Sequence, residues 1–319
     1  MDILSLIRRK SKVLQVTEKI IGLDAVITHI ELAEKYLARG KDERDDNLYT
    51  DVIYRANHAF EGILKEAYTV LTSKNDSKIT PYEIENYLVS KNIFKQRVMD
   101  LFTNYRQEWR NPSTHDYQLF FTEQEAFLAI VNVSAFVNIL LDQMIEQVNF
   151  NLEQEKTRSQ ALEIKSKIDK YSSRELVDKI TQLLLVFSNE LLQSVPFSPK
   201  TEIEILGMLS GFVSSVDGSI QTGNQRLLIG SRAIEPDLIL SFGKESLILE
   251  LKISPPTRMN VKLAQNQLLT MFRLSSEINN GIVFFVPSEK DVSMIVETVH
   301  VKSIGEVTHH IKLIYPRKN

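Results

Sequence analysis

The stretch from Pro236 to Lys252, PDLILSFGKESLILELK, constrains the fold of this chain more than any other. Two apolar runs flank the tetrapeptide FGKE, and a glycine at the first central position of a two-residue turn is typical of a β-hairpin. With Gly243 and Lys244 as the turn, residues whose numbers sum to 487 face each other. Asp237 is then predicted to lie opposite Glu250.

Side chains alternate along a strand, so this hairpin has a leucine-rich face and a mixed face. The face predicted to join the core holds Leu238, Leu240, Phe242, Leu247, Leu249 and Leu251. The other face holds Asp237, Ile239, Ser241, Ile248, Glu250 and Lys252. Two carboxylates facing each other across a strand pair repel unless a cation lies between them. We therefore expect Asp237 and Glu250 to bind a divalent metal, with Lys252 beside it.

One or two carboxylates, with waters and phosphate oxygens, are the usual ligands of Mg²⁺. Pro-Asp, a short strand and then Glu-Leu-Lys resembles the motif of the PD-(D/E)XK nuclease superfamily. The resemblance implies a restriction-endonuclease-like α/β domain with a mixed sheet over 197–319. It also implies Mg²⁺ or Mn²⁺ as cofactor, cleavage of nucleic-acid phosphodiester bonds, and Asp237, Glu250 and Lys252 as catalytic residues. The alternative is an acid at a strand start and an unrelated surface Glu/Lys pair.

A helix is expected to begin at Ser198-Pro199, as N-cap and first-turn proline. Glu202 shares its apolar face, whereas Glu204 points away by roughly 140°. Because the resemblance implies an acid on the helix that precedes the metal-binding strands, Glu202 is assigned that role. Glu204 and Glu190 stay open as alternatives.

The pattern predicts a first strand over 226–230, before the hairpin. After Lys252, it predicts a helix over 260–278 and strands over 281–287, 299–302 and 311–315, the last two at sheet edges. Gln265 shares the apolar face of that helix, so a polar group is expected to point at the sheet. Related nucleases often carry a catalytic Gln there, and Gln265 is assigned to the site. The tyrosine that follows in one branch of the family is absent.

Composition favours a folded, cytoplasmic protein of two domains. The 319 residues are 43% apolar and 25% charged. The absence of cysteine excludes disulfides, thiolate zinc sites and cysteine nucleophiles, and it fits a reducing compartment. A formal net charge of −3 argues against a polybasic nucleic-acid coat. No signal peptide, membrane span or Gly-rich phosphate loop is expected.

The first half of the chain is predicted to be an antiparallel helical bundle. Apolar residues recur at three- and four-residue spacing in four segments: 23–38, 48–71, 81–109 and 122–148. The predicted domains are a bundle over 1–148, a helical connector over 149–196 and the α/β domain over 197–319. On the second helix, Glu61 and Lys65 are expected to form an i,i+4 ion pair on the surface.

The octapeptide RNPSTHDY, from Arg110 to Tyr117, is the informative part of the bundle. Pro112 disfavours a helical residue before it, so the third helix is expected to end near Asn111. Arg110 then lies on the last turn and His115 on the following connection. A guanidinium can grip phosphate and a histidine can move a proton near neutral pH, and metal-free RNA cleavage needs both abilities.

The bundle and this motif resemble the HEPN family over residues 20–148, whose ribonuclease motif pairs an Arg with a His a few residues later. The resemblance implies a homodimer that brings two motifs together, with Arg110 and His115 as catalytic residues. It also implies that Asn111 and Tyr117 assist them. Many relatives only dimerise or bind nucleotides, and the alternative is a helix-capping Arg110 with His115 as a polar loop residue.

Together these features predict a cytoplasmic, homodimeric, metal-dependent nuclease acting on DNA or RNA, with no membrane association. By family analogy, we expect a prokaryotic anti-phage or toxin-type effector with an antitoxin or defence-system partner. The rival hypothesis is a non-catalytic nucleic-acid-binding or sensor protein dimerised by its bundle. DNA and RNA are not distinguished by the sequence, and neither is the activity of the Arg110 motif.

Overall fold

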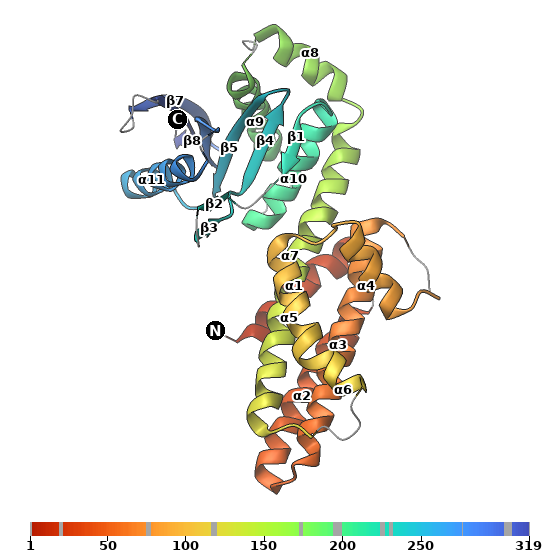
Figure 1. The fold of residues 1–319 in the computed structure, drawn as a ribbon. Helices are drawn as coiled ribbons and strands as arrows, with labels where there is room; N and C mark the ends of the chain where they lie inside the picture. Colours follow the sequence, from red (N-terminus) through yellow and green to blue (C-terminus); the bar gives the residue numbers. More distant parts are fainter. Residues whose placement is uncertain are drawn as a thin grey trace. The chain divides into compact units, whose positions relative to one another are not determined.

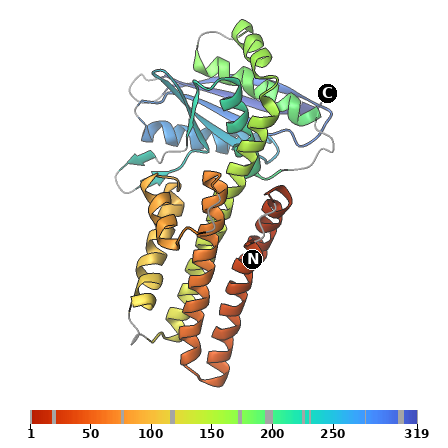
Figure 2. The ribbon, with the colours of Figure 1, turned by 90° about the vertical axis from the view of Figure 1, so that its right-hand side faces the viewer.

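The structure, a computed structural model, describes residues 2–18, 22–74, 78–115, 120–171, 175–193, 200–223, 227–229, 232–275, 277–302 and 308–318. The chain divides into two compact units, Met1–Val148 and Asn149–Asn319. The first is helical and the second is built on a mixed sheet (Figures 1 and 2). Residues 149–196, predicted to be a connector, belong to the second unit instead of linking two others.

The described helical elements of the first unit are α1 (Ile3–Glu18), α2 (Leu23–Glu43), α3 (Asn47–Thr72), α4 (Pro81–Ser90), α5 (Gln96–Tyr105), the π-helical turn η1 (Arg106–Arg110), α6 (Asn111–His115) and α7 (Glu123–Thr157), whose residues from Asn149 on belong to the second unit. α2 and α3 lie side by side as a helical hairpin, and Arg44 ends α2 with a left-handed φ of 54° (Figures 1 and 2).

An aromatic cluster fixes the bundle's core. The ring of Phe60 on α3 lies 4.7 Å from that of Tyr105, 5.1 Å from that of Phe136 and 5.7 Å from that of Phe102. These rings are buried, and centroid separations of this size are favourable for aromatic pairs. The cluster therefore ties α3 to α5 and α7.

Two features of the bundle differ from expectation. The segment predicted as one helix over 81–109 is broken between α4 and α5, where Asn92 has a φ of 52°. The predicted helix end near Asn111 is also wrong, because η1 carries the helix through Pro112 into α6. In the π turn, the N–H of Asn111 donates to the carbonyl of Arg106, five residues earlier. This wider spacing accommodates a proline that would break an α-helix.

Within the described chain, α7 is the one helix whose length and apolar composition would suffice to cross a membrane. Its most apolar window is 56% buried inside the structure. Bundle core residues such as Phe136 and Leu140 lie on it. Core helices of water-soluble proteins have the same composition, so the expectation that no segment spans a membrane stays a prediction.

The described elements of the second unit are α8 (Ala161–Tyr171), α9 (Leu176–Gln193), α10 (Glu202–Val216), β1 (Gln221–Gly223), β2 (Leu227–Ile229), β3 (Arg232–Ile234), β4 (Leu238–Phe242), β5 (Glu245–Lys252), α11 (Arg258–Leu274), β6 (Asn280–Phe285), β7 (Val292–Lys302) and β8 (Thr308–Lys318). The main sheet has the order β1-β4-β5-β6-β8-β7. β5 pairs parallel with β6, and β6 parallel with β8, while the other pairs are antiparallel. The helical first unit and this mixed sheet confirm the predicted combination of a helical part with an α/β part.

The expected strands are displaced in two places. Residues 227–229 form a strand, but it pairs with β3 in a separate two-stranded sheet, and the main sheet begins with β1. β8 lies between β6 and β7, so only β7 of the two predicted edge strands is at an edge. Strand order depends on non-local pairing, which local patterns do not specify.

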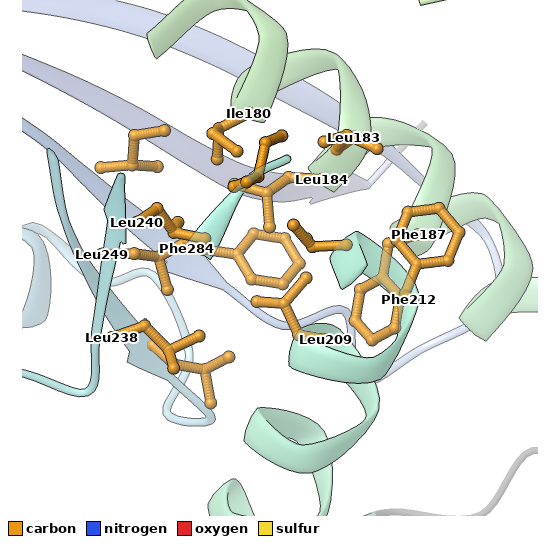
Figure 3. Packing of buried hydrophobic residues seen from close by; sticks show 14 of the residues in the cluster. Ile180, Leu183, Leu184, Phe187, Leu209, Phe212, Leu238, Leu240, Leu249 and Phe284 are labelled. Carbon is orange, nitrogen blue, oxygen red and sulfur yellow. The ribbon is translucent and has the colours of Figure 1, made fainter. Parts of the chain in front are cut away.

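Opposite faces of the sheet bury different helices (Figure 1). Leu247, Leu249 and Leu251 pack with α9 and α10 in one cluster, and Figure 3 shows Phe284 of the sheet between Leu249 and the helix residues Leu184 and Leu209. Ile248 packs with α11 on the other face. The predicted leucine face is thus in the core. Its exception is Phe242, which is 39% exposed at the hairpin tip, with Lys179 5.3 Å from its ring.

Helix α11 lies close against the sheet because of Gly281 on β6. A Cβ atom at this position would lie 2.7 Å from the ring of Phe272 and 3.1 Å from Leu268, both on α11. The missing side chain lets the helix approach the strand. α11 consequently covers the side of the sheet that carries Ile248 and the other residues of the hairpin's mixed face.

Candidate functional site

The predicted register of the hairpin is confirmed. Leu238 pairs with Leu249 and Phe242 with Glu245, so the facing residues sum to 487. Gly243 has a φ of 61° while Lys244 is not in the positive-φ region, as a type II′ turn requires. The turn is tight and the pairing is regular. The sequence therefore determines which residues face each other at the open end of the hairpin and on which side of the sheet each side chain lies.

Asp237 and Glu250 meet at that open end. The N–H of Asp237 donates to Glu250 Oε1 at 3.4 Å, and the N–H of Leu251 donates to Asp237 Oδ2 at 2.7 Å. Each carboxylate is thus held by backbone of the opposite strand. The two acids lie on the same side of the sheet as Ile248, toward α11, as strand alternation predicts.

Lys252 completes the cluster. Its Nζ lies 2.9 Å from Glu250 Oε2 and 3.8 Å from Asp237 Oδ2. The exposed side-chain fractions are 0% for Glu250, 18% for Asp237 and 22% for Lys252. A buried carboxylate thus shares its ammonium partner with a second acid, so one positive charge faces two potential negative charges.

Burial and mutual repulsion shift the pKa values of this cluster. Burial, followed by the charge of Asp237, raises the pKa of Glu250 to about 7. Burial also raises the pKa of Asp237, although Lys252 opposes this shift. For Lys252, burial lowers the pKa, but the hydrogen bond and charge of Glu250 outweigh it and leave the pKa raised. Strongly perturbed groups of this kind are a common property of functional sites.

Glu202, the first residue of α10, lies near the cluster. Burial raises its pKa, the charge of Asp237 adds to the shift and that of Lys252 opposes it. The helix begins at Glu202 with Thr201 as its cap, and not at Ser198-Pro199, which lie outside the described residues. α10 packs on the opposite, leucine face of the sheet, and the charges of Asp237 and Lys252 nevertheless act on Glu202.

The two alternatives to Glu202 have other partners. Glu204 closes the capping box of α10, where its Oε2 accepts from the N–H of Thr201 at 2.8 Å. Glu190 forms an ion pair with Lys156 at 3.2 Å. Glu202 is therefore the acid of the three whose electrostatic neighbours are the hairpin residues. Gln265 is half-buried on α11 beside Ala264, and no contact joins it to Asp237, Glu250 or Lys252 among the described residues.

The donor set suits a hard divalent cation. Among the described residues, no group of three or more His, Cys, Asp or Glu side chains forms a metal-binding cluster. Asp237 and Glu250 would supply two carboxylate ligands, which is enough for Mg²⁺ because this ion keeps several waters. Two converging carboxylates whose charged forms are disfavoured fit such an ion, whose charge would offset their repulsion.

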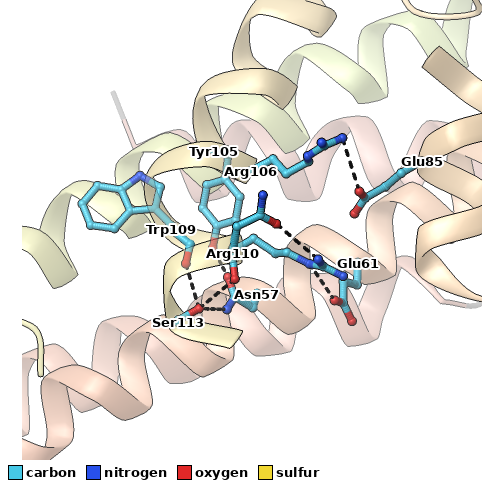
Figure 4. Close-up of polar contacts among 9 residues, drawn as sticks. Asn57, Glu61, Glu85, Tyr105, Arg106, Trp109, Arg110 and Ser113 are labelled. Carbon is cyan, nitrogen blue, oxygen red and sulfur yellow. Dashed lines mark hydrogen bonds and ion pairs between the residues drawn. The ribbon is translucent and has the colours of Figure 1, made fainter. Parts of the chain in front are cut away.

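The Arg110 motif has a different environment (Figure 4). Nε of Arg110 lies 3.5 Å from Glu61 Oε1, and its Nη1 donates to Asn111 Oδ1 at 3.3 Å. The side chain is 17% exposed. The expected surface pair of Glu61 with Lys65 is wrong, because Glu61 turns to a cation on another helix. The side chain of His115, and all of Tyr117, lie outside the described residues.

The polar layer beneath Arg110 was not predicted from the sequence. Glu85 on α4 is 2% exposed, and Arg106 Nη1 lies 3.7 Å from its Oε2. Burial raises the pKa of Glu85, while Arg110 and Arg106 oppose the shift. Asn57 donates to Ser113 Oγ at 2.7 Å and accepts from the hydroxyl of Tyr105 at 3.0 Å (Figure 4). The one feature of the sequence that could have indicated this buried polar layer is the acid Glu85, which lies between the core residues Ile84 and Leu88 of α4.

Comparison of this chain with protein-family models, with curated proteins and with solved structures found no match. Function is therefore inferred from the geometry of the two clusters.

Proposed function

We propose that the second unit is a divalent-metal-dependent nuclease that hydrolyses nucleic-acid phosphodiester bonds. The observation that carries this proposal is the convergence of Asp237, Glu250 and Lys252 at one end of the sheet, with both acids destabilised in their charged forms. A fold that brings together one buried and one half-buried carboxylate, both disfavoured in their charged forms, favours a site that receives a cation.

Each residue has a role consistent with its position. Asp237 and Glu250 would hold Mg²⁺ or Mn²⁺, which when bound supplies Lewis acidity and neutralises phosphate charge. Lys252 already contacts both carboxylates, so it can position a water or stabilise charge on the phosphate after it leaves Glu250. Glu202 would orient the group held by Asp237, and Gln265 would contact substrate at the helix-covered side of the site.

A direct cleavage assay tests the proposal. The purified chain is incubated with labelled DNA and RNA in Mg²⁺, in Mn²⁺ and in EDTA. We expect cleavage only with metal, and its loss in Glu250→Gln. The matched control Glu204→Gln, on the same helix as Glu202 but engaged in capping, is expected to retain activity. Cleavage that is unaffected by EDTA and by Glu250→Gln would contradict a metal site at the hairpin.

We propose that the bundle is the dimerisation unit. α7 exposes Phe127 at 53%, Leu128 at 41% and Val131 at 42%. Phe127 and Val131 line an apolar groove of about 720 Å³, together with Ile3 and Leu37. A contiguous apolar surface of this kind is typical of an interaction site. In the proposed homodimer, the Arg110 motifs of the two chains lie together.

A metal-independent ribonuclease site in the bundle is the second candidate function. The polar layer that holds Arg110 in place favours it, because a positioned guanidinium is what phosphate recognition requires. In the same assay, RNA cleavage that survives EDTA is expected to disappear in His115→Ala. It should persist in His58→Ala, the control, because His58 is an exposed residue of α3 whose ring stacks on that of His29. If EDTA-resistant cleavage persisted in His115→Ala, the Arg110 motif would not be its source.

The non-catalytic alternative also has an observation in its favour. Lys252 compensates Glu250 without any metal, as a purely structural ion pair would. A protein that binds nucleic acid but cuts neither DNA nor RNA under any metal condition would match this alternative. Two units directed at nucleic acid in one chain also agree with a prokaryotic anti-phage or toxin-type effector, with an antitoxin or defence-system partner, which stays a proposal.

A further inference from the structure

Helix α11 has an unusual charge composition. Its sequence, RMNVKLAQNQLLTMFRL, carries three cations, Arg258, Lys262 and Arg273, and no acid. Among the described helices longer than six residues, it is the one without Asp or Glu. No carboxylate of the described residues forms an ion pair with these three side chains. A chain of net charge −3 therefore concentrates uncompensated positive charge on a single helix.

The outer face of α11 is polar and exposed. Its exposed residues are Arg258, Met259, Lys262, Leu263, Asn266, Gln267, Thr270 and Arg273. At 100° per residue, the three cations fall within about 60° of one another around the axis, over a length of roughly 22 Å. By the same geometry Asn266 falls about 20° from Arg273, so its amide lies beside this row. Met259 is 66% and Leu263 58% exposed, so the apolar groups of this face are accessible as well.

The inner face fixes the helix on the sheet. Ala264, Leu268, Met271 and Phe272 are buried against β5, β6 and β8. Thr257 caps the first turn by accepting from the N–H of Asn260, and Asn260 Nδ2 donates to the carbonyl of Pro255 at 2.8 Å. A rigid helix that presents side chains from one face can recognise a partner with little loss of conformational freedom.

The position of α11 connects it to the carboxylate cluster. The helix begins six residues after Lys252, at the carboxyl end of β5, and it covers the sheet face on which Glu250 lies. Ligands of open α/β sheets bind beyond the carboxyl ends of the strands. A polymer that enters the cluster at this end would pass along the first turns of α11, where Arg258 and Lys262 are exposed.

We infer that the outer face of α11 is a docking surface for double-stranded DNA and lies in its major groove. The row of cations matches a phosphate backbone, and the amide of Asn266 beside it is suited to the edge of adenine in the major groove. Exposed apolar groups such as Met259 and Leu263 can contact thymine methyl groups. The major groove of duplex RNA is too deep and narrow for this mode. The inference rests on the proposed nuclease function and specifies its substrate as duplex DNA.

Fluorescence anisotropy with the full chain tests this inference. The probes are a labelled DNA duplex of mixed sequence, its single strand and an RNA duplex of the same sequence, with EDTA present so that no metal-dependent cleavage consumes them. The variant is Lys262→Glu, and the control is Lys244→Glu, an exposed lysine in the turn at the opposite end of the β4–β5 hairpin. Thermal melting is expected to show that both variants are folded, because both side chains are exposed.

We expect the duplex DNA to bind more tightly than either other probe and to lose about tenfold in affinity with Lys262→Glu. Lys244→Glu should bind like the unmodified chain. Lys262→Ala should reduce the slope of log affinity against log salt by about 0.9, the value for one phosphate contact. Equal weakening by both charge reversals, equal binding of RNA duplex or single strand, or no duplex DNA binding would overturn the inference.

This result is separable from the proposed function. Duplex DNA binding through Lys262 without any metal-dependent cleavage would remove the nuclease proposal and leave the docking surface. Metal-dependent cleavage of duplex DNA that is unchanged in Lys262→Glu would retain the nuclease proposal and remove the docking surface on α11.

Discussion

The ammonium of Lys252 lies 2.9 Å from Glu250 Oε2, and the Glu250 side chain is inaccessible to solvent. The same ammonium lies 3.8 Å from Asp237 Oδ2. One half-buried cation thus serves two acids, and the charged form of Glu250 is disfavoured even in its presence. Removing one member of such a buried group has a larger effect than removing a surface ion pair.

Stability should depend on pH through Glu250. Its pKa is raised to about 7 in the folded protein from 4.5. The folded state therefore binds more protons between these values, and the free energy of unfolding falls as pH rises through that window. Without metal, Glu250→Gln should gain stability relative to the unmodified chain, on the order of 2 kcal/mol between pH 5 and pH 8. Urea unfolding at several pH values measures the difference.

The matched control for that experiment is Glu277→Gln, an exposed acid of the same unit. Removing its charge should not reproduce the gain in stability expected of Glu250→Gln, because the side chain of Glu277 is exposed. If the stability difference between Glu250→Gln and the unmodified chain were independent of pH, Glu250 would titrate as an ordinary carboxyl group. Repulsion between Glu250 and Asp237 could then no longer support a metal site.

Glu202 and Glu204 lie two residues apart on α10 but should behave differently. Glu202→Gln removes an acid that senses Asp237 and Lys252, so Mn²⁺ affinity should fall by about 10- to 100-fold, as for residues that orient metal ligands. Glu204→Gln affects only the capping box and should leave Mn²⁺ affinity unchanged. Calorimetric titration measures both. Equal affinities of the two variants would place Glu202 outside the site.

In the bundle, Arg110 should matter more for stability than Lys65. Arg110→Ala leaves Glu61 without its partner and removes a cation that opposes the raised pKa of buried Glu85. We expect a loss of about 2 kcal/mol in the free energy of unfolding. Lys65→Ala, at the position predicted to pair with Glu61, should change stability by less than about 0.5 kcal/mol. Thermal unfolding compares them, and an equal loss in both would contradict the role of Arg110.

The exposed residues of α7 should control oligomeric state. Light scattering of the full chain at micromolar concentration is expected to show a dimer, and Phe127→Glu is expected to show a monomer because a charge would be buried in an apolar contact. Leu162→Glu is the control, since Leu162 is 85% exposed on α8. A monomer for the unmodified chain would remove the basis for a composite Arg110 site.

Local features of the chain were predictable from its sequence. The hairpin register followed from Gly243 and from strand alternation, which is why the placement of Asp237 beside Glu250 and Lys252 was predictable. Pro112 was misjudged because a π turn, which local propensity does not foresee, carries the helix past it. The partner of Glu61 was misjudged because Arg110 reaches it from another helix.

Non-local packing also explains the misplaced connector. The apolar stripe of α9, including Ile180 and Leu184, was visible in the sequence, but its burial partner was not. That partner is the leucine face of the hairpin, distant in the chain. Once the stripe packs there, the helix becomes part of the sheet-containing unit. The choice of Glu202 over Glu204 followed from the helical face in the sequence, and the capping box shows that Glu204 is engaged by Thr201.

Calorimetric titration of the full chain with Mn²⁺ tests the central claim most directly. We predict one divalent ion per chain, a melting temperature that rises with Mn²⁺ concentration, and the loss of both effects in Asp237→Asn, which leaves the leucine face untouched. Lys244→Ala, at the far end of the hairpin, should bind Mn²⁺ like the unmodified chain. Absence of Mn²⁺ binding, or equal binding by Asp237→Asn, would contradict a metal site at Asp237 and Glu250.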